Sequence, residues 1–160
     1  MNTELSPKVQ IKLSALLVNS KLDKYIKLHD LFLKKAGTLR SFIKNIFGIS
    51  VPFDRFVEQA HEIEKEMLSI IDGISSTHDN VKNVMTAEEE NYMSCLLRYS
   101  ESLHQAIVAL RDYQEGLLKK SKGGKLKYAT SKDLLAKYQQ SIEAYKEIGL
   151  ELNSLSYIIL

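Results

Sequence analysis

The sequence has few residues of several types, and each scarcity narrows the range of structures that the chain can adopt. Its 160 residues include no Trp, two Pro and seven Gly, and so few helix breakers favour long helices. A single cysteine, Cys95, excludes an intramolecular disulfide and favours a reducing, cytoplasmic setting. No stretch approaches the ~18 apolar residues of a membrane span. The polar start, which contains Pro7, lacks the apolar core of a signal peptide.

The composition that remains is typical of a folded soluble protein. Apolar residues make up 44% and charged residues 26%, and a chain of this length can bury a core without a structural metal. The charges are segregated, with a net +6 in residues 1–50, −8 in 51–118 and +4 in 119–160. Either oppositely charged helices lie side by side, or a basic surface is kept for a partner.

Apolar residues recur at intervals of three and four, which predicts amphipathic helices. The first helix is expected to begin at Ser6 and Pro7 and to run toward Phe47. Its apolar positions change phase. One stripe is Val9, Leu13, Leu16 and Leu17, and the next includes Leu22, Tyr25, Ile26, His29, Phe32, Leu33 and Ala36. An unbroken helix would be ~60 Å long, so we expect this helix to bend, break or project beyond the others.

Three later helices follow from regular stripes and end signals. The second is expected from Phe53 to Ile74, followed by a polar loop over residues 75–84. Thr86 and Glu89 form a capping box that starts the third helix. Gly123 and Gly124 stop that helix, and Thr130 or Ser131 caps the fourth.

These helices predict an all-α fold. We expect one domain over residues 1–160, an antiparallel four-helix bundle with five helices if the first is broken. The apolar end, Tyr157 to Leu160, is expected to dock into the core or onto another subunit.

Two Glu-x-x-His motifs suggest a metal site. Glu58 with His61, and Glu101 with His104, have the spacing of ligands in di-iron four-helix bundles. The heptad frame places both pairs toward solvent, and they lie on consecutive rather than alternate helices. We therefore predict no metal and no cofactor.

The segment from Arg98 to His104 resembles the Arg-x(4–6)-His motif of HEPN-type ribonucleases, which are small all-α dimers. That resemblance implies a general base at His104 and transition-state stabilisation by Arg98. The motif covers seven residues, and Tyr99 stands where the family usually has a polar residue.

A lysine-rich segment joins the third and fourth helices. Flexible lysines with glycines and one tyrosine suit a phosphate backbone, although solvated lysines at a helix C-terminus need no ligand. The candidate nucleic-acid-binding residues are Lys119, Lys120, Lys122, Lys125 and Lys127.

The remaining polar and aromatic residues favour packing over chemistry. Tyr92, Tyr99, Tyr113, Tyr138 and Tyr145 are expected at the core edge with solvated hydroxyls, and His29 is expected to be a packed histidine. Cys95 has no nearby base in the sequence, so nucleophilic catalysis has no support.

The inward positions are almost all apolar, whereas a catalytic site needs convergent polar groups. We therefore predict a non-enzymatic interaction module, an adaptor, inhibitor, immunity or scaffold subunit that binds another protein or itself as a homo-oligomer. The alternatives are a nucleic-acid-binding subunit and the HEPN-like ribonuclease. Amphipathic helices can also reopen on lipid, which leaves membrane activity open.

Overall fold

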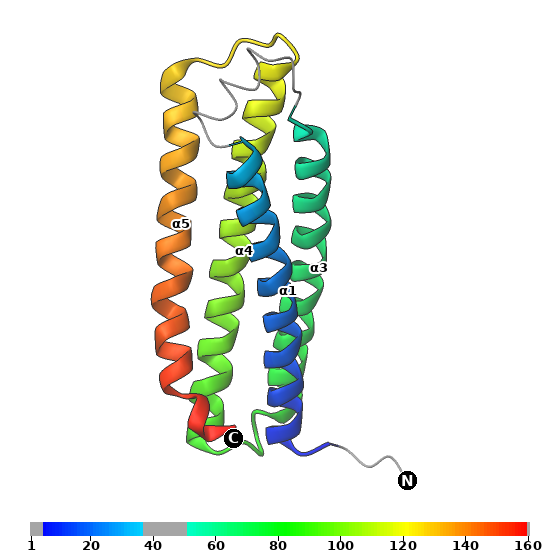
Figure 1. Cartoon of the computed structure of the whole chain (residues 1–160). Coiled ribbons are helices and arrows are strands. Elements are labelled where there is room, and N and C mark those ends of the chain that lie inside the picture. Colours follow the sequence, from blue (N-terminus) through cyan, green and yellow to red (C-terminus); the bar gives the residue numbers. More distant parts are fainter. Residues whose placement is uncertain (1–4, 37–50, 160) are drawn as a thin grey trace.

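The computed structural model describes residues 5–36 and 51–159, and in them the chain forms a bundle of four long helices (Figure 1). The helices are α1 (Pro7–Ala36), α3 (Phe53–Val81), α4 (Ala87–Ser121) and α5 (Tyr128–Ser154), followed by the short 3-10 helix η1 (Ser156–Ile158). Successive helices run in opposite directions (Figure 1). The all-α antiparallel four-helix bundle predicted from the sequence is confirmed.

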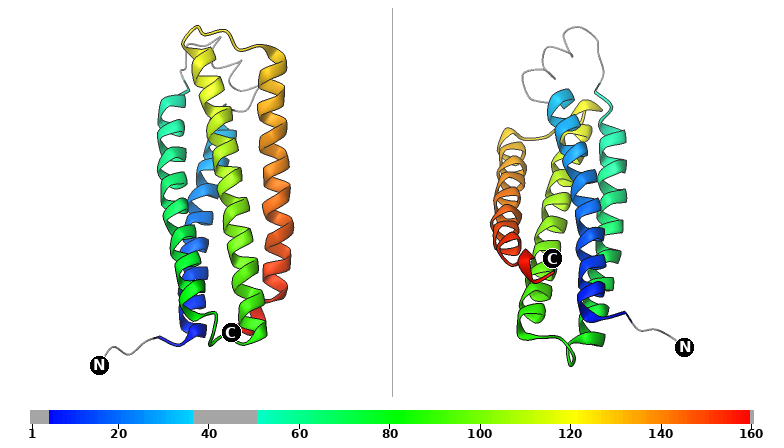
Figure 2. Two further views of the ribbon diagram at one scale, coloured as in Figure 1. Left: turned by 180° about the vertical axis from the view of Figure 1, so that it is seen from behind. Right: turned by 60° about the horizontal axis from the view of Figure 1, so that its bottom comes forward.

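Helix α4 is the central element, because it packs against α1, α3 and α5. Its buried side chains occupy several faces and include Met93, Leu103, Ala106, Ile107 and Leu110. Helix α5 stands apart from α1, whereas α1 lies beside α3 (Figure 2). The seam between α1 and α5 is therefore bridged by long side chains.

Helix α1 does not break at its change of phase. It is continuous from Pro7 to Ala36, and the expected continuation toward Phe47 lies outside the described residues. Its core stripe keeps one phase throughout, and the buried residues are Ile11, Ser14, Val18, Tyr25, Leu28, Phe32 and Ala36. The apparent change of phase arises because the N-terminal half has a second apolar face.

Two helix boundaries differ from the sequence prediction. The expected polar loop over 75–84 is confirmed for the turn at residues 82–84, but it is wrong for residues 75–81, because α3 continues to Val81, which is buried one heptad after Ile74. Its polar residues stay helical since Gly and Pro are absent between 74 and 81. Helix α5 begins at Tyr128, so neither Thr130 nor Ser131 is its cap.

The other end signals are confirmed. Thr86 Oγ1 accepts the backbone N–H of Glu89 at 3.2 Å, and the Glu89 carboxylate accepts the Thr86 N–H at 2.9 Å. Gly123 ends α4 with φ +82°, a conformation that L side chains rarely adopt. At the C-terminus Ile159 is buried in the core, as expected for an apolar end that docks, whereas Tyr157 of the same segment is 69% exposed.

Candidate functional site

The N-terminal half of α1 is apolar on both sides. Its inner side contributes Ile11, Ser14 and Val18 to the core. The opposite side, here called the outer face, is Val9, Leu13, Leu16 and Leu17, with exposed fractions of 40%, 47%, 57% and 54%, and Leu5, just before the helix, is 53% exposed. Helix α1 therefore has two apolar stripes where packing in the bundle needs one. A cluster of exposed leucines of this kind is typical of an interaction surface.

A shallow hollow borders the outer face on the side of α3. It has a volume of about 730 Å³. Leu13 and Leu17 contribute from α1, and Thr77, Asn80 and Val81 contribute from the last turns of α3. The Gln10 side-chain amide donates a hydrogen bond of 2.8 Å to the Leu5 carbonyl oxygen, which holds the start of the stripe against α1.

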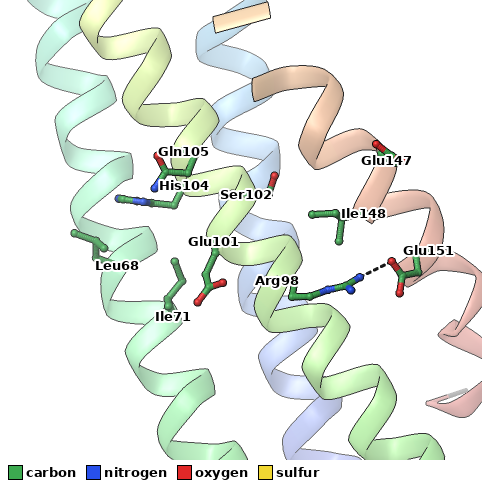
Figure 3. A pocket seen from close by; sticks show the side chains of 10 residues that line it. All are labelled: Leu68, Ile71, Arg98, Glu101, Ser102, His104, Gln105, Glu147, Ile148 and Glu151. Carbon is green, nitrogen blue, oxygen red and sulfur yellow. Dashed lines mark hydrogen bonds and ion pairs between the residues drawn. The ribbon is translucent and has the colours of Figure 1, made fainter. Parts of the chain in front are cut away.

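A second hollow crosses α4 between α3 and α5 (Figure 3). It is open, with a volume of about 910 Å³. Its polar residues are Arg98, Glu101, Ser102, His104, Gln105, Glu147 and Glu151, and its apolar residues are Leu68, Ile71 and Ile148.

The two residues of the ribonuclease-like motif lie in this hollow but do not converge. The Arg98 guanidinium forms an ion pair with the Glu151 carboxylate of α5, whereas the His104 ring points toward α3 (Figure 3). Burial lowers the pKa of His104, and its Nε2 is buried without a hydrogen-bond partner among the described residues. The nuclease hypothesis thus receives no support from the positions of these two side chains.

The members of the two Glu-x-x-His motifs do not converge. Glu58, His61 and Glu101 are exposed, and His61 lies 3.5 Å from a Glu64 carboxylate oxygen and 3.4 Å from one of Glu115. The expectation that both pairs face solvent is wrong for His104, which is half-buried with its Nε2 atom buried. In the described part of the chain, no group of three or more His, Cys, Asp or Glu side chains is placed to hold a metal ion.

All five candidate lysines are exposed at the end of the bundle where α4 meets α5 (Figure 1). Within the described ranges none of them forms an ion pair or a side-chain hydrogen bond. The five residues are Lys119, Lys120, Lys122, Lys125 and Lys127. The lysine segment is therefore a charged surface that neighbouring acidic helices do not neutralise.

Elsewhere the segregated charges do meet across helix boundaries. Lys21 and Lys24 of α1 contact Glu66 of α3 at 2.7 and 2.9 Å. Arg111 of α4 pairs with Glu64 of α3. Part of the charge segregation thus reflects the choice of neighbouring helices.

A buried polar chain joins α1 to α5. Tyr25 donates a hydrogen bond of 3.2 Å to the Tyr138 hydroxyl, and Tyr138 is in turn bonded to His29 Nδ1. Burial lowers the pKa of His29, which favours a neutral ring whose Nδ1 can accept a hydrogen bond from the Tyr138 hydroxyl. The prediction of a solvated hydroxyl is wrong for Tyr138, which is 2% exposed; the prediction that His29 is a packed histidine agrees with its place here.

Sequence reasoning missed the direction of the outer face. The stripe of Val9, Leu13 and Leu16 is visible in the sequence, but the spacing of Ile11, Ser14 and Val18 continues the core phase of Tyr25. The regular spacing of these buried positions is the signal that distinguishes the core face from the outer face. It was missed because Ser14, a polar residue, occupies one of the core positions.

None of the helices in the described part of the chain combines the length and the hydropathy that crossing a membrane requires. Comparisons with known proteins found no match, whether among family models, curated proteins or solved structures.

Proposed function

We propose that this protein is a non-enzymatic interaction module, an adaptor, inhibitor, immunity or scaffold subunit, that binds another polypeptide through the outer face of α1. The observation that carries the proposal is the exposure of Leu13, Leu16 and Leu17 on a helix whose opposite side already fills the core. Burial of a half-exposed leucine gains about 1 kcal/mol. Several on one helix face give a partner a continuous contact of the helix-in-groove or helix-pair type.

The geometry of the polar residues favours binding over catalysis. The larger hollow is open, and the guanidinium of its Arg98 already forms an ion pair with the Glu151 carboxylate. A catalytic site instead needs groups held together in a pocket that excludes water. The cytoplasmic location expected from the single Cys95 belongs to the same proposal.

A photo-crosslinker tests this function. A photoreactive amino acid is introduced at Leu16, and separately at Leu150 of α5 as a matched control, since Leu150 is also exposed (72%) and lies on another helix. Irradiation in the cells that make the protein should give one defined protein adduct at position 16. It should give none at position 150. Absence of any protein adduct at position 16 contradicts the proposal.

The second candidate function is nucleic-acid binding by the lysine segment. It is favoured by five exposed lysines without ion-pair partners among the described residues. Replacing Lys119, Lys122 and Lys125 by Gln should weaken binding to single-stranded nucleic acid and flatten its salt dependence. Equal, salt-independent binding by the wild-type and triple-variant proteins, or no binding at low salt, contradicts this candidate.

A further inference from the structure

The flank of the outer face carries charges of both signs. At about 100° per residue, Lys8, Lys12, Asp23 and Asp30 fall within about 60° of one another around the helix, and Lys34 lies about 20° farther round. The N-terminal half of the flank thus carries two lysines, whereas the C-terminal half carries both aspartates and one lysine. Lys8, Lys12, Asp23 and Asp30 are exposed, and none of these four has an ion-pair partner among the described residues, where Lys21 and Lys24 of α1 do form ion pairs.

A second copy of this chain satisfies that pattern. When two identical helices pack antiparallel about a two-fold axis, the same flank of each faces the other. Lys8 of one flank can then lie beside Asp23 of the other, which favours this orientation. A parallel pair instead puts the same flank of the two helices on opposite sides of the contact, where these two residues do not meet.

We propose that two copies of the protein dock through the outer faces of α1, antiparallel and related by a two-fold axis. The proposal rests on the function proposed above and names the partner as a second copy. An isologous contact of this kind closes on itself, so it forms a dimer rather than a filament.

The apolar residues give the register. A two-fold axis between Leu13 and Leu16 puts Leu13 of each chain opposite the partner's Leu16 at the centre of the contact. Val9 then lies opposite the partner's Ser20, whose small side chain lets the two helices approach closely. The apolar centre is the source of affinity, because the leucines that are exposed in the single chain are removed from water when the two helices meet.

The charges are consistent with the same register. Lys8 and the partner's Asp23 are separated by about 3 Å along the helix axis, at 1.5 Å per residue. A lysine side chain spans that offset. The two-fold axis produces this pair twice, and solvent-exposed pairs of this type contribute more to orientation than to affinity.

Native mass spectrometry of the full chain over a concentration series tests the dimer. The wild-type protein should be dimeric. Leu16→Glu, at an exposed position that leaves the core intact, should weaken the dimer by about 100-fold. The matched control Leu150→Glu should remain dimeric. A wild-type monomer at every concentration, or a dimer that Leu16→Glu leaves unchanged, overturns the proposal.

A charge exchange tests the orientation. Lys8→Glu and Asp23→Lys should each weaken the dimer several-fold, since each places like charges together. The double variant Lys8→Glu/Asp23→Lys should restore the wild-type dissociation constant. Additive weakening in the double variant rules out the antiparallel register.

Disulfide formation tests the register independently of charge. Oxidation of a mixture of Val9→Cys and Ser20→Cys chains should give mainly the mixed disulfide dimer, whereas a parallel pair related by a two-fold axis gives homodimers of each variant. The native Cys95 is buried and adds little background. Failure of this inference is distinguishable from failure of the proposed function. A monomer whose Leu16 still crosslinks to a different protein keeps the function and removes the second copy.

Discussion

The Tyr138 hydroxyl lies 3.2 Å from that of Tyr25, and this pair links α5 to α1 inside the bundle. Both side chains are almost fully buried, at 2% and 1% exposed. The ring of Tyr145 adds an edge-to-face contact with Tyr25 at 5.9 Å between centroids. The seam between α1 and α5 is thus stabilised by aromatic and polar contacts together.

Replacing Tyr138 by Phe should lower the free energy of unfolding by about 1–3 kcal/mol. The substitution leaves the Tyr25 hydroxyl and His29 Nδ1 without their buried partner. Urea denaturation measures the change. Tyr128→Phe is the control, because Tyr128 is 85% exposed and its hydroxyl has no hydrogen-bond partner in the part of the chain that the structure describes. Equal stability of both variants would show that the buried hydroxyl adds nothing.

The stability should fall as the pH is lowered from 7 toward 5. Burial lowers the pKa of His29 and His104 below the ordinary value near 6.5. Just below pH 6.5 the unfolded chain therefore binds more protons than the folded one, so folding loses stability until the pH passes the folded pKa. Urea denaturation at each pH should give a shallower dependence for His29→Gln/His104→Gln than for wild type. An unchanged slope contradicts this assignment.

Replacing Gln114 by Met should leave stability unchanged or raise it by about 1 kcal/mol. Gln114 is fully buried, and neither polar atom of its side chain has a hydrogen-bond partner among the described residues. A buried amide without partners costs free energy that a thioether of similar size does not. Ser100→Ala is the contrast, since Ser100 Oγ donates a bond of 2.8 Å to the Leu96 carbonyl oxygen and its loss should destabilise. A loss of stability from Gln114→Met, measured by thermal unfolding, would reveal a partner for the amide.

Thr86→Ala should cost about 1 kcal/mol of unfolding free energy, because the capping box satisfies two backbone N–H groups at the start of α4. Thr130→Ala is the matched control. The sequence made Thr130 a candidate cap, but it lies inside α5 and is exposed. The denaturation midpoint should therefore fall for Thr86→Ala and remain at the wild-type value for Thr130→Ala. A fall for Thr130→Ala without one for Thr86→Ala would contradict the observed helix boundaries.

The sequence predicted the helix ends well where the contacts that end or start the helix lie within a few residues of each other. The Thr86–Glu89 box and Gly123 fix helix ends through their own backbone contacts, so their positions follow from the sequence. The end of α3 did not follow, since Val81 is buried beside the hollow that α1 borders although the residues before it are polar.

The candidate surface was only half predictable. The leucines of the outer face were recognised as a stripe, but the direction of that stripe depends on which side of α1 packs against α3 and α4. Ser14 is buried in the core face and carries no apolar signal. The link between Tyr25 and Tyr138 joins residues 113 positions apart, and no spacing rule within one helix reveals it.

The most direct test of the outer face uses the absence of Trp from the chain. Leu16→Trp introduces a single tryptophan at the centre of the proposed contact, and Leu150→Trp is the matched control on α5. At concentrations that favour the dimer, the tryptophan emission of the Leu16→Trp protein should be blue-shifted, and it should move to the red on dilution as the indole becomes hydrated. The control should stay red throughout. Red emission from the Leu16→Trp protein at every concentration would contradict the proposed dimer, because the outer face of α1 would then stay in water at concentrations where a second copy should cover it.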